Sequence, residues 1–155
     1  MSINQVTQFL DAHNIRYVTI THSPAYTAQE VAAHALLPGD ELAKTVIVKL
    51  DDAPVMAVVP ASYRIDLDKL RWAAKADRAE IAAEAEFVVM FPDCRTGAMP
   101  PFGNLYDMPV WIDERMVRNR YIDFNACSHT ELIRMRMTDF LRLVRPMEAS
   151  FGEPE

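Results

Sequence analysis

The stretch that decides the fold is residues 45–59, which read TVIVKLDDAPVMAVV. Two apolar runs, Thr45 to Leu50 and Val55 to Val59, are rich in β-branched residues, and the polar segment Asp51-Asp52-Ala53-Pro54 separates them. Short runs of this kind on either side of a turn-forming segment are typical of paired strands. We therefore predict a β-hairpin at 45–59 and place the other elements around it.

The segments on both sides of the hairpin carry mixed helix and strand signals. Upstream, Ser2-x-x-Gln5 and Thr27-Ala28-Gln29-Glu30 resemble capping boxes and predict helices from residue 2 and over 27–35, with a strand at 16–21 between them. Downstream, the patterns predict helices at 66–74, 84–91 and 138–145, and strands at 110–112, 121–125 and 132–135. Because no regular βαβ alternation is present, the expected fold class is α+β, with a mixed or antiparallel sheet surrounded by helices.

Length and composition indicate one globular domain. The chain has 155 residues, of which half are hydrophobic and a quarter charged, which fits a single domain over 1–146. The acidic segment 147–155 is expected to be a disordered tail. No apolar run is long enough to span a bilayer, and no signal peptide precedes the domain, so we expect a cytoplasmic protein without membrane contact. Cys94 and Cys127 are expected to be reduced and unpaired.

The charge argues against tight binding along a nucleic acid. The formal net charge is −6, whereas proteins that contact many phosphates are usually basic. The distribution is uneven, however, because residues 113–145 hold seven arginines against five acidic residues. Arg115, Arg118 and Arg120 lie close together in the sequence and form either a small basic contact patch or an ordinary solvated surface. The pattern allows brief contact with one end of a nucleic acid.

Several catalytic motifs are missing. The sequence has no HExxH, no clustered Cys/His spacing, no Walker loop, no GxGxxG and no GxSxG. We therefore expect no metal, no cofactor and no activated serine. A nucleophile pair formed by Cys94 or Cys127 with His129 stays open, although an inert buried thiol is the simpler interpretation.

Three segments carry candidate chemistry. The loop Gly97-Ala98-Met99-Pro100-Pro101-Phe102-Gly103 contains two of the four glycines and a Pro-Pro pair, so it either holds backbone N–H groups toward a carbonyl oxygen or is a rigid turn. Lys44 precedes the first hairpin strand, where a lysine is usually solvated. The segment NACSHT, residues 125–130, is a polar turn whose histidine is most often exposed or structurally hydrogen-bonded.

Taken together, these three segments resemble the YbaK/EbsC family. KTVIV at 44–48, GAMPPFG at 97–103 and NACSHT at 125–130 occur in the family's order and spacing, and the resemblance extends from about His22 to Val144. The members are bacterial aminoacyl-tRNA deacylases related to the editing domain of prolyl-tRNA synthetase. The resemblance implies a curved, barrel-like mixed sheet with helices around it and a pocket on one side.

The resemblance also implies roles for individual residues. Lys44 would line the pocket near the terminal adenosine and the ester, the Gly97 and Ala98 backbone would bind the carbonyl, and His129 would stand at the last turn. The remaining expected substrate contacts are Thr45, Met99, Pro100, Pro101, Phe102, Gly103 and Ser128. The uneven charge, rather than the resemblance, gives Arg115, Arg118 and Arg120 as the expected tRNA contacts. Water would attack the ester without a metal or an acyl-enzyme, and fixed donors would stabilise the oxyanion.

The sequence leaves the substrate and one alternative function open. Thr45 resembles cysteine-editing members, the PPF loop resembles a broader branch, and Cys127 replaces a frequent glycine, so alanine, cysteine and serine all stay possible as the amino acid removed. The expected partner is the acceptor end of a mischarged tRNA, that of proline or a related one, and prolyl-tRNA synthetase is a candidate protein partner; DNA is not expected. The alternatives are a catalytically silent module that binds aminoacyl-adenosine or another nucleotide, and a regulatory protein that only keeps the fold.

Overall fold

The predicted hairpin is the centre of the larger sheet in the computed structural model, which describes residues 2–21 and 41–155. Strands β2 (Ala43–Leu50) and β3 (Ala53–Pro60) pair antiparallel, from Ala43↔Pro60 to Leu50↔Ala53. The two turn residues, Asp51 and Asp52, both have positive φ, 50° and 71°, as a two-residue type I′ turn requires. The Asp51 carboxylate also accepts hydrogen bonds from the backbone N–H groups of Asp77 and Arg78, which ties the turn to the neighbouring chain.

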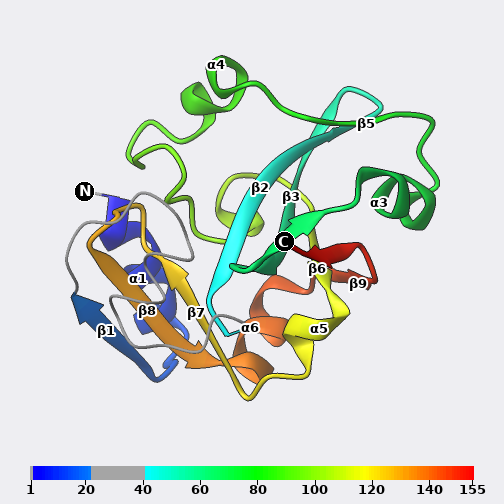
Figure 1. Cartoon of the computed structure of the whole chain (residues 1–155). Coiled ribbons are helices and arrows are strands. Elements are labelled where there is room, and N and C mark those ends of the chain that lie inside the picture. Colours follow the sequence, from blue (N-terminus) through cyan, green and yellow to red (C-terminus); the bar gives the residue numbers. More distant parts are fainter. Residues whose placement is uncertain (1, 22–40) are drawn as a thin grey trace.

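The elements form three sheets and several short helices (Figure 1). The five-stranded sheet has the order β5-β2-β3-β6-β9, the three-stranded sheet the order β1-β8-β7, and β10 pairs with β4. The other strands are β1 (Tyr17–Thr21), β4 (Tyr63–Ile65), β5 (Ala79–Ile81), β6 (Val110–Asp113), β7 (Tyr121–Asn125), β8 (Glu131–Arg136), β9 (Met147–Ala149) and β10 (Gly152–Pro154). The helices are α1 (Ser2–Ala12), α3 (Leu67–Ala74), α4 (Glu84–Phe87), α5 (Glu114–Val117) and α6 (Met137–Val144), with 3-10 turns η1 (Val88–Met90) and η2 (Gly103–Leu105).

The expected α+β class with a mixed sheet is confirmed. Pairing is antiparallel in β2–β3 and β2–β5 but parallel in β3–β6 and β6–β9, so the five-stranded sheet is mixed. The expected curved, barrel-like sheet is not closed into a barrel. Among the described residues, a parallel bridge between Leu42 and Asp123 links the smaller sheet to the segment that leads into β2. The expected helix at 27–35 lies outside the described residues.

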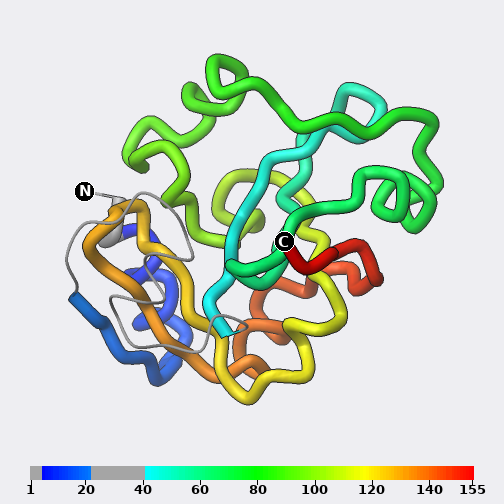
Figure 2. Tube along the Cα trace, in the orientation of Figure 1, coloured from blue at the N-terminus to red at the C-terminus, as the bar shows by residue number. Residues whose placement is uncertain are grey.

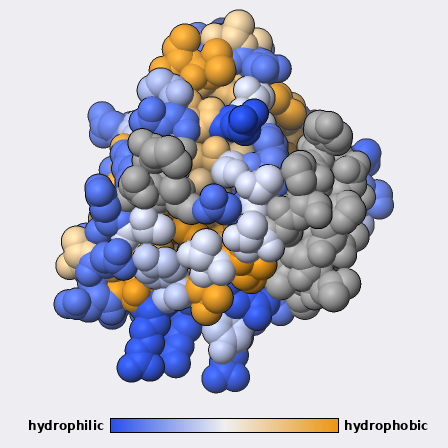
Figure 3. All heavy atoms as spheres, turned by 90° about the vertical axis from the view of Figure 1, so that its left-hand side faces the viewer, coloured by the Kyte–Doolittle hydropathy of each residue, from blue (hydrophilic) through white to orange (hydrophobic). Residues whose placement is uncertain are grey.

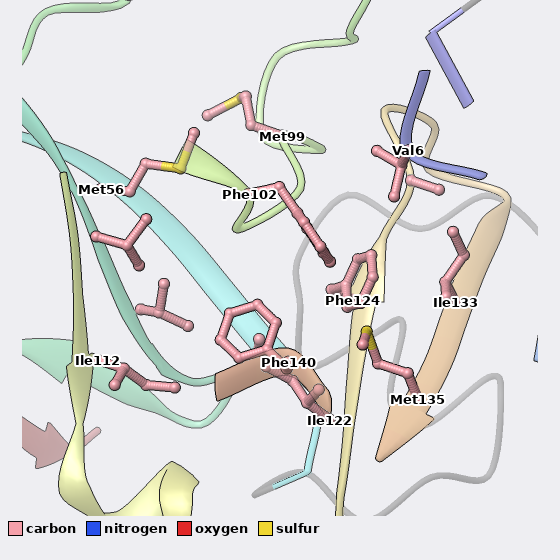
Figure 4. Packing of buried hydrophobic residues seen from close by; sticks show 14 of the residues in the cluster. Val6, Met56, Met99, Phe102, Ile112, Ile122, Phe124, Ile133, Met135 and Phe140 are labelled. Atoms are coloured by element: carbon pink, nitrogen blue, oxygen red, sulfur yellow. The ribbon is translucent and has the colours of Figure 1, made fainter. Parts of the chain in front are cut away.

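One hydrophobic cluster joins the two main sheets. We call it the main core; it contains Ile47, Met56, Val58 and Ile112 of the larger sheet, Ile122, Phe124, Ile133 and Met135 of the smaller sheet, and Val6, Leu10 and Phe140 of α1 and α6. Figure 4 shows Phe102 and Met99 entering this cluster from the loop that follows η1. Phe102 stacks edge-on against Phe140, with ring centroids 5.5 Å apart, and tilts against Phe124 at 5.2 Å. The loop is therefore anchored by its own aromatic residue.

A second cluster covers the opposite face of the larger sheet. Val48, Val59 and Trp111 pack there against Leu70 of α3 and Phe151 near the C-terminus. Helix α3 begins where the sequence predicts, because the Asp66 carboxylate accepts a hydrogen bond from Lys69 N–H at 3.1 Å, which is the N-cap interaction.

The C-terminal segment is ordered, so the expected disordered tail 147–155 is wrong. β9 pairs with β6 and β10 pairs with β4. Phe151 has no exposed area, and burying such a side chain stabilises the fold by about 1.5–3 kcal/mol. The buried Asp113 carboxylate accepts hydrogen bonds from the N–H groups of Phe151 (3.0 Å) and Gly152 (2.6 Å). The tail's acidic side chains face outward while its backbone completes two sheets.

Two predicted helices differ from those observed. The helix expected at 84–91 is one α-turn, α4, followed by the 3-10 turn η1. Val89 is 73% exposed there, so no core stabilises a longer helix. The N-cap of helix α6 is Arg136, two residues before the expected cap Thr138. Figure 2 shows the chain after β5 crossing the top of the molecule before it descends to the candidate loop.

Candidate active site

The loop 95–98 and the turn after β7 are joined by backbone hydrogen bonds. Cys127 N–H donates to the Ala98 carbonyl at 2.8 Å, and Arg95 N–H donates to the Cys127 carbonyl at 3.1 Å. These two hydrogen bonds connect the segment just after β7 to the loop 95–98. The structure thus brings together two of the three segments that the sequence singles out, residues 97–103 and 125–130.

Gly97 is exposed and has φ +84°. Residues with a Cβ rarely adopt this conformation, so the glycine is needed for the backbone rather than for space. Ala98 N–H donates to the Arg95 carbonyl at 3.0 Å, so its expected role as a carbonyl-binding donor stays a prediction that requires this bond to be shared or broken. Gly97 N–H donates to no acceptor within the described part of the chain. Of the Gly97 and Ala98 N–H groups, that of Gly97 is therefore the one that a substrate oxygen can accept a hydrogen bond from.

His129 lies directly against this glycine. Its Nε2 is 2.8 Å from the Thr96 carbonyl oxygen, so Nε2 carries the proton and donates. In the neutral ring this leaves Nδ1 as an acceptor. A Cβ on Gly97 would stand 3.5 Å from His129 Cε1. Ser128 and Thr130 hydrogen-bond each other through their hydroxyls at 2.9 Å and fix the turn that carries the ring.

The two cysteines link the same turn to the segment before the Gly97 loop. Cys94 and Cys127 form a disulfide with a Cα–Cα distance of 4.2 Å, so the expectation of two unpaired thiols is wrong. The Tyr106 hydroxyl lies 3.7 Å from Cys94 Sγ and 3.8 Å from Cys127 Sγ. Burial raises the pKa of Tyr106, with a further contribution from the charge of Asp93. A cysteine nucleophile paired with His129 has no support in this arrangement.

Lys44 lies away from the loop. Alternation along β2 places Lys44 on the face of Val46 and Val48, which pack with the second cluster. The Lys44 ammonium is 3.3 Å from a Glu155 carboxylate oxygen, and its side chain is 26% exposed. Thr45 is on the opposite face of β2, toward the main core. The structure therefore does not show Lys44 converging with Gly97 and His129.

Several expected substrate contacts are packed inside the protein. Phe102 has no exposed area and Met99 is 5% exposed, while Pro100, Pro101 and Gly103 are also buried. A Cβ on Gly103 would lie within contact distance of the Met108 carbonyl oxygen, so this glycine allows a close backbone approach. In this structure Phe102 anchors the loop through Phe124 and Phe140, and its expected contact with substrate stays a prediction.

The expected basic patch is divided between two regions. Arg115 donates to the Tyr63 hydroxyl at 2.6 Å and lies over the Tyr63 ring. The Arg120 guanidinium instead lies over Tyr121, 5.6 Å from the ring centroid. Arg118 is exposed at the end of α5. These three arginines follow one another in the sequence but do not share one set of contacts.

Sequence reasoning missed one buried polar group near the turn. Asn125 is 7% exposed, and its Oδ1 accepts no hydrogen bond from the described residues. Most buried polar atoms have a partner, so this oxygen is an available acceptor two residues before Cys127. No pattern in the sequence distinguishes this asparagine from an ordinary strand-end residue.

Within residues 2–21 and 41–155, no group of three His, Cys, Asp or Glu side chains is arranged to hold a metal ion. In the same part of the chain, no helix has the length and apolar character needed to cross a membrane.

The chain is similar in fold to several solved structures. The hypothetical protein APE2540 superposes with a TM-score of 0.86 at 17% identity, covering 96% of this chain and 99% of that one. A candidate trans-editing enzyme for prolyl-tRNA synthetase gives 0.83 at 19%, covering 98% and 97%. A candidate signal transduction protein from Marinobacter aquaeolei VT8 gives 0.74 at 16%, covering 96% of this chain but 30% of that one. No curated protein matches the sequence significantly.

The sequence itself also matches a family model. The model of the aminoacyl-tRNA editing domain matches residues 22–143, which include the hairpin, the Gly97 loop and the His129 turn. This range covers most of the chain. The protein therefore belongs to the aminoacyl-tRNA editing domain family.

Proposed function

We propose that this protein hydrolyses the ester that joins an amino acid to the 3′ end of a mischarged tRNA. Family membership supports aminoacyl-tRNA deacylation in general. The observation that carries the proposal to particular residues is the exposed Gly97, at φ +84°, whose peptide His129 holds through the Thr96 carbonyl. A fixed N–H that has no partner among the described residues is suited to an oxyanion that forms at the carbonyl under attack.

The reaction needs few groups. Water adds to the ester carbonyl carbon, the carbonyl oxygen becomes an oxyanion next to Gly97 N–H, and collapse breaks the bond to the ribose oxygen. The proton lost by water goes to that ribose oxygen, directly or through the vicinal 2′-hydroxyl. His129 Nδ1 is the acceptor that can orient the water or the hydroxyl, because Nε2 is bound to Thr96. We propose that no metal and no acyl-enzyme takes part.

Lys44 keeps a proposed role outside the reacting centre. Its pairing with Glu155 and its place on the second-cluster face suit a contact with the terminal adenosine or its phosphate better than one with the ester oxygen. Because Lys44 and Glu155 are both partly exposed, their ion pair contributes little to stability. The Lys44 ammonium can therefore exchange Glu155 for a substrate phosphate at little electrostatic cost.

The proposed substrates carry a small amino acid. Alanine, cysteine and serine are the candidates, and tRNA for proline is the first tRNA to test because the similar trans-editing structure is associated with prolyl-tRNA synthetase. The test is a deacylation panel with this tRNA carrying alanine, serine, cysteine or proline, with and without EDTA. The proposal expects turnover of at least one small amino acid, sparing of prolyl-tRNA and no effect of the chelator. Binding without turnover of any ester would instead support a silent aminoacyl-adenosine module.

A further inference from the structure

A cationic groove lies on the outer side of the three-stranded sheet, at the end far from the His129 turn. Its volume is about 290 Å³, and its lining residues are Arg16, Tyr17, Val18, Tyr121, Arg134, Met135 and Arg136. They come from the beginnings of β1 and β7 and the end of β8, which the antiparallel register places side by side, as in the pair Tyr121↔Arg136. Figure 3 shows strongly hydrophilic side chains along the lower edge of this side of the molecule.

One arginine of the groove is held rigidly. Arg134 donates from Nε to the fully buried Asp123 carboxylate at 2.7 Å and pairs with Glu41 at 3.2 Å. Its guanidinium lies 5.0 Å from the centroid of the Tyr121 ring, and Arg120 approaches the same ring. The guanidinium groups of Arg120 and Arg134 thus both lie over the Tyr121 ring. Planar N–H donors and an aromatic ring therefore occur at the same place.

The other two arginines are not neutralised. Arg16 and Arg136 are exposed, and neither has a carboxylate partner within the described residues. In a protein of net charge −6, these two guanidinium groups have no carboxylate partner among the described residues, and they stand beside Arg134, which is paired with Asp123 and Glu41. The groove is therefore positive at Arg16 and Arg136. Arginine binds phosphate oxygens with paired N–H donors, and tyrosine can stack on a base or ribose.

We propose that this groove binds the phosphodiester backbone of the tRNA acceptor end, an inference that rests on the proposed function. Strand β7 leads from the groove at Tyr121 toward the turn that carries His129. The four residue steps to Asn125 span about 13 Å, and the eight positions to His129 at most about 26 Å, at roughly 3.3 Å per residue. At about 3.4 Å per stacked nucleotide, the groove lies roughly four to eight nucleotides from the esterified end.

A second cationic face offers a matched control. Trp72 on α3 is 80% exposed, and Asp68, Lys69 and Arg71 line the hollow beside it, with Arg71 3.9 Å from the Asp68 carboxylate. That face belongs to the second-cluster side of the larger sheet, and no strand leads from it to the His129 turn. It carries the same number of removable charges, so a purely non-specific charge effect would appear equally at both places.

The experiment compares two double variants, Arg16→Gln/Arg136→Gln and Lys69→Gln/Arg71→Gln, with the wild-type chain. Arg134 is left intact because removing it would strand the buried Asp123 carboxylate. Binding of uncharged tRNA is measured by fluorescence anisotropy from 50 to 300 mM salt. Hydrolysis is measured with mischarged tRNA and with 2′(3′)-O-alanyl-adenosine, which has no phosphate.

The groove variant is expected to bind tRNA about tenfold or more weakly and to lower the log–log salt slope by about 2. Its hydrolysis of tRNA at low concentration should fall in proportion, while hydrolysis of alanyl-adenosine stays at the wild-type rate. The α3 variant should match wild type in every assay. Equal losses of tRNA affinity in both variants, or no loss in the groove variant, would overturn the proposal that the groove binds tRNA. If the wild-type chain hydrolyses neither ester, the proposed function fails, and the binding arm still tests the groove.

Discussion

The His129 ring packs against Gly97 and is tied by a 2.8 Å hydrogen bond to the carbonyl of the preceding residue, Thr96. One histidine thereby fixes the Thr96–Gly97 peptide through its carbonyl, and the N–H of the same trans peptide points to the side opposite that carbonyl. The turn after β7 and the loop before η2 act as one unit, because Cys127 and Ala98 are also joined through their backbones.

Replacement of His129 by alanine is expected to lower the single-turnover deacylation rate by about 10²-fold. The loss of one hydrogen bond at a partly exposed site should cost only about 1 kcal/mol of stability. The control is His13→Ala, because His13 also hydrogen-bonds a backbone carbonyl, that of Phe9 at 2.8 Å, on helix α1. Equal rates for the two variants would remove His129 from the reaction.

Replacement of Lys44 by alanine should separate binding from chemistry. Because Lys44 pairs with Glu155 rather than with the loop, we expect a higher KM for mischarged tRNA and a smaller change in kcat, with stability altered by no more than about 0.5 kcal/mol. Lys49→Ala is the control, since Lys49 is on the same strand and pairs with Glu80 and Glu86. A large fall in kcat alone would place Lys44 at the ester after all.

Stability is expected to depend on Asp66 at low pH. The N–H of Lys69, and then the Glu153 side chain, hold the pKa of Asp66 below its usual value. A lowered folded-state pKa stabilises the protein above the unfolded value of about 3.9, and this contribution is lost as the pH falls through the folded-state pKa. Asp66→Ala should therefore cost about 1 kcal/mol at pH 7 and progressively less below pH 4.

Urea denaturation at pH 7, 4 and 3 measures this dependence. Asp68→Ala is the control, because that carboxylate is on the same helix and its side chain is 92% exposed. A cost of Asp66→Ala that is the same at all three pH values would show that its charge does not contribute.

The Cys94–Cys127 disulfide closes a segment with a sequence separation of 33. Constraining a loop of that length in the unfolded chain stabilises the native state by about 3–4 kcal/mol. Dithiothreitol should therefore lower the Tm of the wild-type protein and leave that of Cys94→Ser unchanged. A wild-type Tm that is insensitive to the reductant would show that the two sulfurs are not bonded in solution.

The sequence predicts the elements whose signal is local. The hairpin at 45–59, the Asp66 cap and the strands around Val110, Tyr121 and Leu132 have clear patterns, and all occur in the structure. The three-residue strands β4, β5, β9 and β10 were not predicted, because pairing with distant partners creates them. Phe151 shows the reason. The acidic composition of residues 147–155 predicts disorder, but Phe151 packs in the second cluster with residues far away in the sequence and so holds the tail in place.

The same distinction applies to the site. Gly97 and His129 could be singled out from their motifs, but their contact depends on the path of the chain between α4 and β7. The disulfide and the engagement of Ala98 N–H depend on that same path, so local patterns could not reveal them. The groove was missed because Arg16 and Arg136 are 120 positions apart and meet only through the register of β1 and β8.

The central claim is that the ester is hydrolysed beside the Gly97 peptide. Its most direct test is the single-turnover rate of Gly97→Ala on the preferred mischarged tRNA. A Cβ at φ +84° should turn the peptide and misplace its N–H, and losing one such donor typically lowers the rate about 10²–10³-fold. Asn14→Ala is the control for backbone strain, because Asn14 also has positive φ, 57°, in the turn after α1. The account predicts that Gly97→Ala loses at least 10²-fold in rate while melting like Asn14→Ala, which keeps full activity. A folded Gly97→Ala protein that deacylates tRNA at the wild-type rate would contradict it.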